Sequence, residues 1–117
     1  MRMRTSLKTM VPAAAFIALG LTAELAVAAG GDPELGRAKS TTCHACHGAD
    51  GLAIAPNYPK LAGQHEAYLV HVLRQYRSGE RKNAIMAGFA TGLSDQDIAD
   101  LAAFYAELDG LTTPSRD

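Results

Sequence analysis

The sequence lacks the features that mark several large classes of protein. Its 117 residues carry a net charge of −1, so there is no basic excess of the kind that typifies nucleic-acid binding. No internal repeat or low-complexity tract is visible, and no segment shows the clear period-two alternation of a β-strand. The longest apolar run is well short of the roughly 20 residues that a membrane-spanning helix needs. These absences leave a small all-α domain as the expected fold class.

The first 28 residues have the pattern of a secretory signal peptide. A basic start (MRMRTSLK) precedes the apolar stretch 11–21, and small residues in an A-x-A pattern follow up to Ala28. We therefore expect export from the cytosol, cleavage near Ala28 and a mature domain over residues 29–117. Such a domain has eight Lys or Arg against eleven Asp or Glu, a net charge of −3. The alternative is that the segment is retained as a membrane anchor.

Three segments have the pattern of helices, separated by loops rich in Gly, Pro and Asn. The first, 32–40, has Asp32 as an N-cap and proline at the first helical position. The second, 64–78, has an apolar stripe at helical spacing and is followed by Gly79, a suitable terminator. The third, 95–108, follows a serine that begins a capping-box-like Ser-Asp-Gln-Asp sequence. The stripes consist of Leu69, Val72, Leu73 and Tyr76 in the second segment and of Ile98, Leu101, Ala102 and Tyr105 in the third.

The only two cysteines lie in the pentapeptide Cys43-His-Ala-Cys46-His47. The C-x-x-C-H pattern is the attachment signal of c-type haem. Two cysteines one helical turn apart can each form a thioether with a haem vinyl group, and His47 can then bind the iron. The alternatives are a redox dithiol, which calls for a preceding β-strand, a zinc site with ligands from His65 and His71, and a chance match. The long connection that follows the motif also indicates that something besides side-chain packing holds the chain.

Met86 is the only methionine after the expected cleavage site. It lies 39 residues after His47, between the second and third expected helices, in a segment expected to be a flexible loop. A loop methionine can bring its thioether to the open face of a haem iron, so we expect Met86 to be the second axial ligand. The alternatives are a packing role for Met86, ligation by His65 or His71 instead, and an open iron site.

Taken together, the motifs resemble a class I bacterial cytochrome c, and most closely a single domain of the cytochrome c4 or c553 group. They are residues 43–51 (CHACHGADG), 56–64 (PNYPKLAGQ), 83–88 (NAIMAG) and 93–98 (LSDQDI), and the resemblance covers residues 31–108. Cytochrome c4 proteins resemble two such domains in tandem. Because this chain has only one, the single-domain label fits it better.

The resemblance implies a small class I cytochrome c fold, with three main helices and long loops around one covalently bound haem c. It implies that Pro56 offers its backbone carbonyl to the Nδ1–H of His47, which would fix the tautomer of the imidazole. It also implies that Gly36 lets the first and last helices cross closely, with Phe104 or Tyr105 filling the contact. The residues expected to pack on the haem are Tyr58, Leu61, Leu73 and Ile85.

Axial ligation by His47 and Met86 predicts an electron carrier rather than an enzyme, because it leaves the iron no free position for a substrate. We expect a periplasmic one-electron shuttle whose partners are redox proteins, such as a respiratory complex, an oxidase or a flavoprotein dehydrogenase. Nucleic acid is not an expected partner, and membrane contact is expected only through partner complexes or a retained N-terminal segment. The alternatives are the haem subunit of a flavocytochrome-type dehydrogenase and a gas-binding sensor in which Met86 does not bind iron.

Overall fold

The computed structural model describes residues 30–112, and the expected signal segment with its cleavage site near Ala28 lies outside these residues. The elements in chain order are α1 (Pro33–Lys39), the 3-10 helix η1 (Ser40–Thr42), α2 (His44–His47), α3 (Glu66–Ser78), α4 (Ala84–Ala90) and α5 (Asp95–Glu107). Over residues 30–112 the regular structure is entirely helical, which confirms the all-α prediction. None of the helices in this range has the length and apolar character needed to cross a membrane.

The three predicted helices correspond to α1, α3 and α5, with small differences at their ends. The Asp32 carboxylate accepts hydrogen bonds from backbone N–H groups in the first turn of α1, as an N-cap should. At the start of α5, Ser94 Oγ accepts from the Asp97 N–H at 3.0 Å and the Asp97 carboxylate accepts from the Ser94 N–H at 2.9 Å, a complete capping box. α3 begins two residues later than predicted and ends at Ser78, and the following Gly79 caps it with a φ of +77°, which suits glycine.

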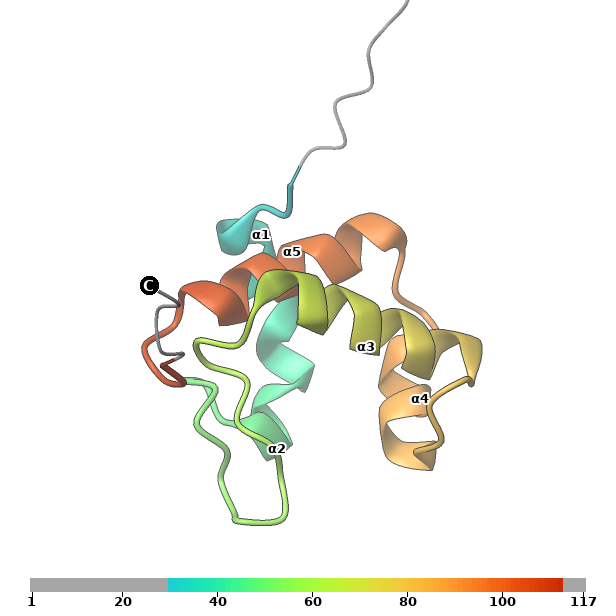
Figure 1. Ribbon diagram of the computed structural model, residues 1–117, viewed down its shortest axis with the longest axis horizontal. Coiled ribbons are helices and arrows are strands. Elements are labelled where there is room, and N and C mark those ends of the chain that lie inside the picture. Colours follow the sequence, from blue (N-terminus) through green and yellow to red (C-terminus); the bar gives the residue numbers. More distant parts are fainter. Residues whose placement is uncertain (1–29, 113–117) are drawn as a thin grey trace, which may run out of the picture.

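Helices α1 and α5 cross at very close range (Figure 1). Gly36 of α1 is buried at the crossing, and a methyl group there would overlap the backbone carbonyl of Asp100 and lie 2.7 Å from Phe104 Cβ. Only glycine allows the two backbones to approach this closely. The expected role of Gly36 is confirmed, with Phe104 as the residue that fills the contact.

The core lies where α3 and α1 pack against α5, and the two predicted apolar stripes contribute to it differently. All four stripe residues of α5 are buried. On α3 only Leu69 is buried, whereas Val72, Leu73 and Tyr76 are half-buried and line a cavity. Much of the apolar face of α3 therefore points toward a space that protein side chains leave open.

Backbone hydrogen bonds hold the long connection between α2 and α3. The Ala53 N–H donates to the His47 carbonyl at 2.7 Å, which folds the connection back onto α2. Farther along, the Gly63 N–H donates to the Tyr105 carbonyl at 2.9 Å, which fixes the other end to α5. The connection is thus a defined structure, attached to both the α2 segment and the C-terminal helix.

The expectation that Met86 lies in a loop is wrong, because residues Ala84–Ala90 form the helix α4. The Asn83 side chain caps this helix by accepting a hydrogen bond from the Met86 N–H at 3.0 Å. Helix α4 packs against α3, and Ala90 is its only buried residue. A seven-residue helix that includes Gly88 gives only a weak helical signal in the sequence.

Candidate functional site

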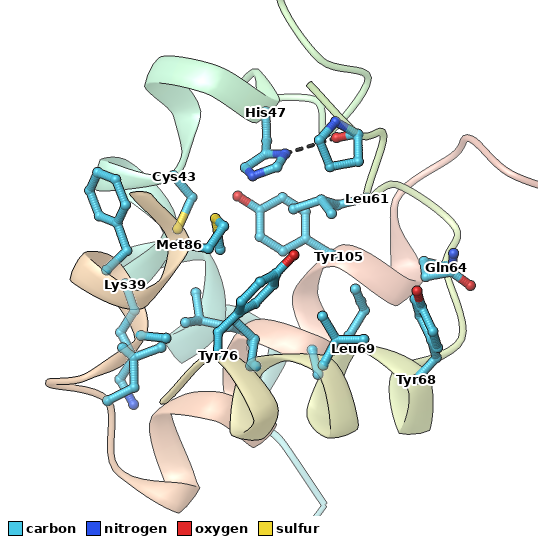
Figure 2. A pocket seen from close by; sticks show the side chains of 18 of the residues that line it. Lys39, Cys43, His47, Leu61, Gln64, Tyr68, Leu69, Tyr76, Met86 and Tyr105 are labelled. Atoms are coloured by element: carbon cyan, nitrogen blue, oxygen red, sulfur yellow. Dashed lines mark hydrogen bonds between the residues drawn. The ribbon is translucent and has the colours of Figure 1, made fainter. Parts of the chain in front are cut away.

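A hollow with mostly apolar walls lies between α2, α3, α4 and the connection after α2 (Figure 2). It consists of two adjoining cavities of about 200 and 230 Å³. Residues on the walls of both cavities are Thr42, Cys43, His47, Pro59, Tyr76, Met86 and Phe89. Cys46 lines the second cavity. The structure therefore brings the four predicted residues Cys43, Cys46, His47 and Met86 to one hollow.

The two cysteines are half-buried free thiols one helical turn apart, with Cys43 directly before α2 and Cys46 within it. Burial raises the pKa of the Cys43 thiol. A reactive redox dithiol has the opposite shift, since its thiolate is stabilised. The zinc alternative also lacks a ligand set: within residues 30–112 no three His, Cys, Asp or Glu side chains come together as a metal site. His65 and His71 are exposed and lie outside both cavities.

His47 is buried, with 6% of the residue exposed, and Pro59 holds the orientation of its imidazole. His47 Nδ1 lies 2.8 Å from the Pro59 carbonyl oxygen. Because a carbonyl only accepts hydrogen bonds, Nδ1 must carry the proton, and in the neutral ring Nε2 then keeps a lone pair. The geometry leaves Nε2 as a ligand atom for a metal in the hollow.

The assignment of this hydrogen bond to Pro56 is therefore wrong, and Pro59 is the acceptor. The Tyr58 N–H donates to the Ala55 carbonyl at 3.1 Å, so residues 55–58 form a β-turn with Pro56 at its second position, where proline is favoured. Pro56 is exposed at the tip of this turn, and the chain returns so that the Pro59 carbonyl faces His47. The sequence offers both prolines but no signal for which carbonyl faces the imidazole.

Met86 reaches the hollow from α4, whereas His47 reaches it from α2. In Figure 1 these two short helices flank the region below α3. The residues expected to pack on a haem also line the hollow: Leu61 and Leu73 the first cavity, Tyr58 and Ile85 the second.

Comparison with known proteins assigns the chain to a family. The family model described as Cytochrome c matches residues 34–109. The chain belongs to the cytochrome c family. It is 53% identical over 90 residues to cytochrome c4 of Pseudomonas aeruginosa, an alignment that covers 77% of this chain and 44% of that protein. It is also 51% identical over 79 residues to cytochrome c-554(548) of Halomonas halodenitrificans, covering 65% of this chain and 95% of that protein.

The fold of this cytochrome c is similar to that of a solved cytochrome c4. The crystal structure of reduced recombinant cytochrome c4 from Pseudomonas stutzeri matches with a TM-score of 0.66 and 43% identity, covering 69% of this chain and 47% of that one. The chain thus spans about half the length of the cytochromes c4 that it matches. The predicted resemblance to the cytochrome c4 group and the class I fold are confirmed.

The cytochrome c family implies one haem c, attached through thioethers of Cys43 and Cys46, and the walls of the hollow suit this group. Tyr105 lines the hollow, and its buried hydroxyl lies beside Cys43 and Ser40 but makes no hydrogen bond of normal geometry among the described side chains and backbone. Such an orphaned donor in a native protein calls for a partner, which a bound molecule can supply. Burial raises the pKa of Tyr105, so the hydroxyl keeps its proton. The sequence predicted only a structural contact for this residue.

The charged groups around the hollow suit haem as well. Its walls are mainly apolar, but Lys60 and Arg81 also line it, whereas the Lys39 ammonium is paired with Asp97 and Asp100. A porphyrin with two carboxylate side chains matches such a set, because its ring needs apolar contacts and its carboxylates need cations or water. The Arg81 guanidinium also lies 5.2 Å from the centre of the Tyr76 ring, which holds it beside the cavity.

Proposed function

We propose that this protein is a periplasmic one-electron carrier in which His47 and Met86 bind the haem iron from opposite sides of the porphyrin. The single observation that carries the proposal is the gathering of both cysteines, one imidazole and one thioether around the same hollow. The imidazole and the thioether come from separate helices, α2 and α4. A bound group can therefore be held between them rather than from one side alone.

His47 would act as a well-oriented, electron-donating ligand. Its Nδ1–H is directed at the Pro59 carbonyl, 2.8 Å away, which fixes the ring plane and the tautomer. A hydrogen bond of this kind makes the opposite nitrogen a stronger donor to a metal.

Met86 would supply a neutral, weakly donating thioether, which favours the reduced state of a haem iron. When bound, the haem supplies one-electron chemistry through its iron. The chain would contribute His47 and Met86 as iron ligands, and the apolar side chains of Leu69, Val72 and Leu73 on α3 would cover the porphyrin. With both axial positions filled by protein atoms, the site suits electron transfer rather than conversion of a substrate.

The same proposal covers export and partners. Residues 1–28 would direct the chain to the periplasm, where the domain 29–117 would carry its haem. The partners would be redox proteins that donate and accept electrons, met through small and short-lived contacts. If the protein instead is a stable haem subunit of a dehydrogenase, it will copurify with a flavoprotein when isolated under mild conditions.

Carbon monoxide binding tests the proposal. We expect the reduced holoprotein at neutral pH to show no spectral change under carbon monoxide, because Met86 occupies the position that the gas needs. The Met86→Ala variant should bind the gas readily and so provides the positive control. Ready binding by the wild-type protein would contradict the proposal and favour a gas-binding site.

A further inference from the structure

Helix α4 is poorly anchored for an element that carries a proposed iron ligand. Its only buried residue is Ala90, while Ile85 and Phe89 are 63% and 48% exposed. A helix of seven residues is too short to be stable by itself in water. The position of Met86 must therefore depend on how the two ends of the segment 79–94, which joins α3 to α5, are held.

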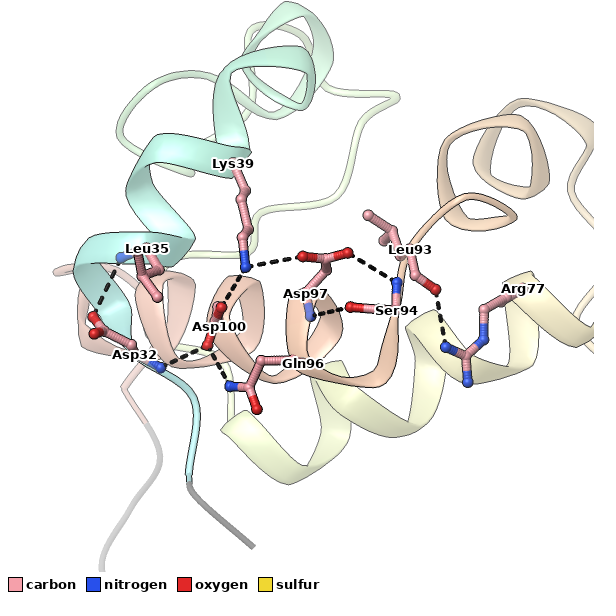
Figure 3. A network of polar contacts seen from close by, with 9 residues as sticks. All are labelled: Asp32, Leu35, Lys39, Arg77, Leu93, Ser94, Gln96, Asp97 and Asp100. Carbon is pink, nitrogen blue, oxygen red and sulfur yellow. Dashed lines mark hydrogen bonds and ion pairs between the residues drawn. The ribbon is translucent and has the colours of Figure 1, made fainter.

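Arg77 joins these two ends. It lies in the last turn of α3, just before the segment begins, and its Nη1 donates to the Leu93 carbonyl at 3.0 Å where the segment ends (Figure 3). Its Nη2 donates to Asp95 Oδ1, in the first turn of α5, at 2.6 Å. One planar guanidinium thus closes the segment 79–94 into a loop at its base. The Arg77 side chain is only 30% exposed, so the contact is partly shielded from water.

The surroundings of this contact connect it to the hollow. Leu93, whose carbonyl Arg77 binds, also lines the first cavity together with Met86. The hydrogen bond from Arg77 is the main cause that lowers the pKa of Asp95, so the carboxylate is ionised at neutral pH and the bond is charge-assisted. A shift of the stem formed by Arg77 and Leu93 would therefore move one wall of the site.

We propose that Arg77 is a positioning residue for the Met86 thioether: by closing the base of the segment 79–94 it makes α4 present Met86 to the iron. The proposal rests on the proposed function, since it takes Met86 as an axial ligand. Lysine cannot reproduce the role in full, because a single ammonium group lacks the planar fork that reaches two acceptors.

Competition with imidazole measures this role directly. Added imidazole can bind the ferric iron only after Met86 has left it, so the apparent affinity reports the population of the open form. We expect Arg77→Ala in the holoprotein to raise the imidazole affinity about 3- to 10-fold, the loss that follows from removing charge-assisted hydrogen bonds. Arg77→Lys should give an intermediate rise, and the reduction potential should fall in the same order.

Arg74→Ala is the matched control. Arg74 lies one turn earlier on α3, is 53% exposed and approaches Asp95 only to 3.7 Å. This ion pair is with a residue outside the segment 79–94, so the imidazole affinity of Arg74→Ala should stay within about twofold of the wild-type value. An equal rise in both variants would show a general charge effect and would overturn the proposal.

Two further outcomes would also overturn it. One is that Arg77→Ala lowers the unfolding midpoint but leaves the imidazole affinity unchanged, which describes a purely structural residue. The other is that Arg77→Lys binds imidazole with the wild-type affinity. This result decides the question if Arg77→Ala yields no holoprotein. Failure of the proposed function looks different: wild-type protein and Met86→Ala would then bind imidazole equally well, whatever residue stands at position 77.

Discussion

Replacing Gly36 by alanine sets two effects of known size against each other. Alanine favours a helix over glycine by about 1 kcal/mol, so the substitution should stabilise α1 by itself. At this position, however, the new methyl group would overlap the Asp100 carbonyl and lie 2.7 Å from Phe104 Cβ. Overpacking of this kind costs about 1–3 kcal/mol, and a backbone obstacle places the cost at the upper end because it cannot rotate away.

The same shift would strain the polar contacts that join α1 to α5. The buried Asp100 carboxylate accepts hydrogen bonds from the Asp32 N–H at 2.9 Å, from Lys39 Nζ and from the Gln96 amide (Figure 3). Two of these donors belong to the N-terminal helix or its cap, so moving α1 outward would lengthen both bonds. We therefore expect the free energy of unfolding to fall by about 2 kcal/mol in Gly36→Ala, after the gain in helix propensity is subtracted.

Guanidinium unfolding of the oxidised holoprotein, followed by far-ultraviolet circular dichroism, measures the difference. Gly88→Ala is the control: Gly88 is an exposed helical residue, and a methyl group there would meet no atom within 4 Å apart from its chain neighbours and the backbone of its own helix. Its gain in helix propensity is unopposed, so stability should stay unchanged or rise by up to about 1 kcal/mol. A Gly36→Ala protein as stable as Gly88→Ala would refute the argument from close helix crossing.

Two more predictions concern a helix cap and an ionisable group. Asn83→Ala removes the side chain that caps α4 by accepting a hydrogen bond from the Met86 N–H. Such a cap is worth ~1 kcal/mol, so we expect imidazole to bind the ferric holoprotein about fivefold more tightly. Asn83→Asp keeps a capping oxygen and should keep the wild-type affinity. The pKa of Asp97 is lowered from 3.8 to about 2, first by the hydrogen bond from Lys39 and then by the Ser94 N–H. The contribution of Asp97 to stability is therefore complete above about pH 4 and is lost as the pH falls toward about 2. Over that interval the free energy of unfolding should fall less in Asp97→Asn than in the wild type, as an acid titration can measure.

Much of the fold could be predicted because the signals were local. The cap at Asp32 and the capping box at Ser94 fixed where helices start, and apolar spacing fixed their faces. Periodicity could not distinguish a face packed on protein from one packed on a cofactor. Of the α3 stripe only Leu73 was expected to pack on a haem, although Leu69, Val72 and Tyr76 line the hollow as well.

The site residues that could be predicted are those that a sequence motif or a unique residue type marks. The C-x-x-C-H motif placed Cys43, Cys46 and His47 together, and the single methionine of the mature domain pointed to Met86. The choice between Pro56 and Pro59 depended instead on a turn whose path brings only one carbonyl to the imidazole. The role of Arg77 depends on a contact 16 residues away along the chain, which no local pattern reveals.

The oxidised absorption spectrum of the holoprotein, recorded for wild type and Met86→Ala, tests the proposed axial pair most directly. With His47 and Met86 on opposite sides of the iron, the wild type should show a weak thioether-to-iron band at the red end of the spectrum. Met86→Ala should lose that band while keeping its covalent haem. A band of equal strength in both proteins would contradict the account.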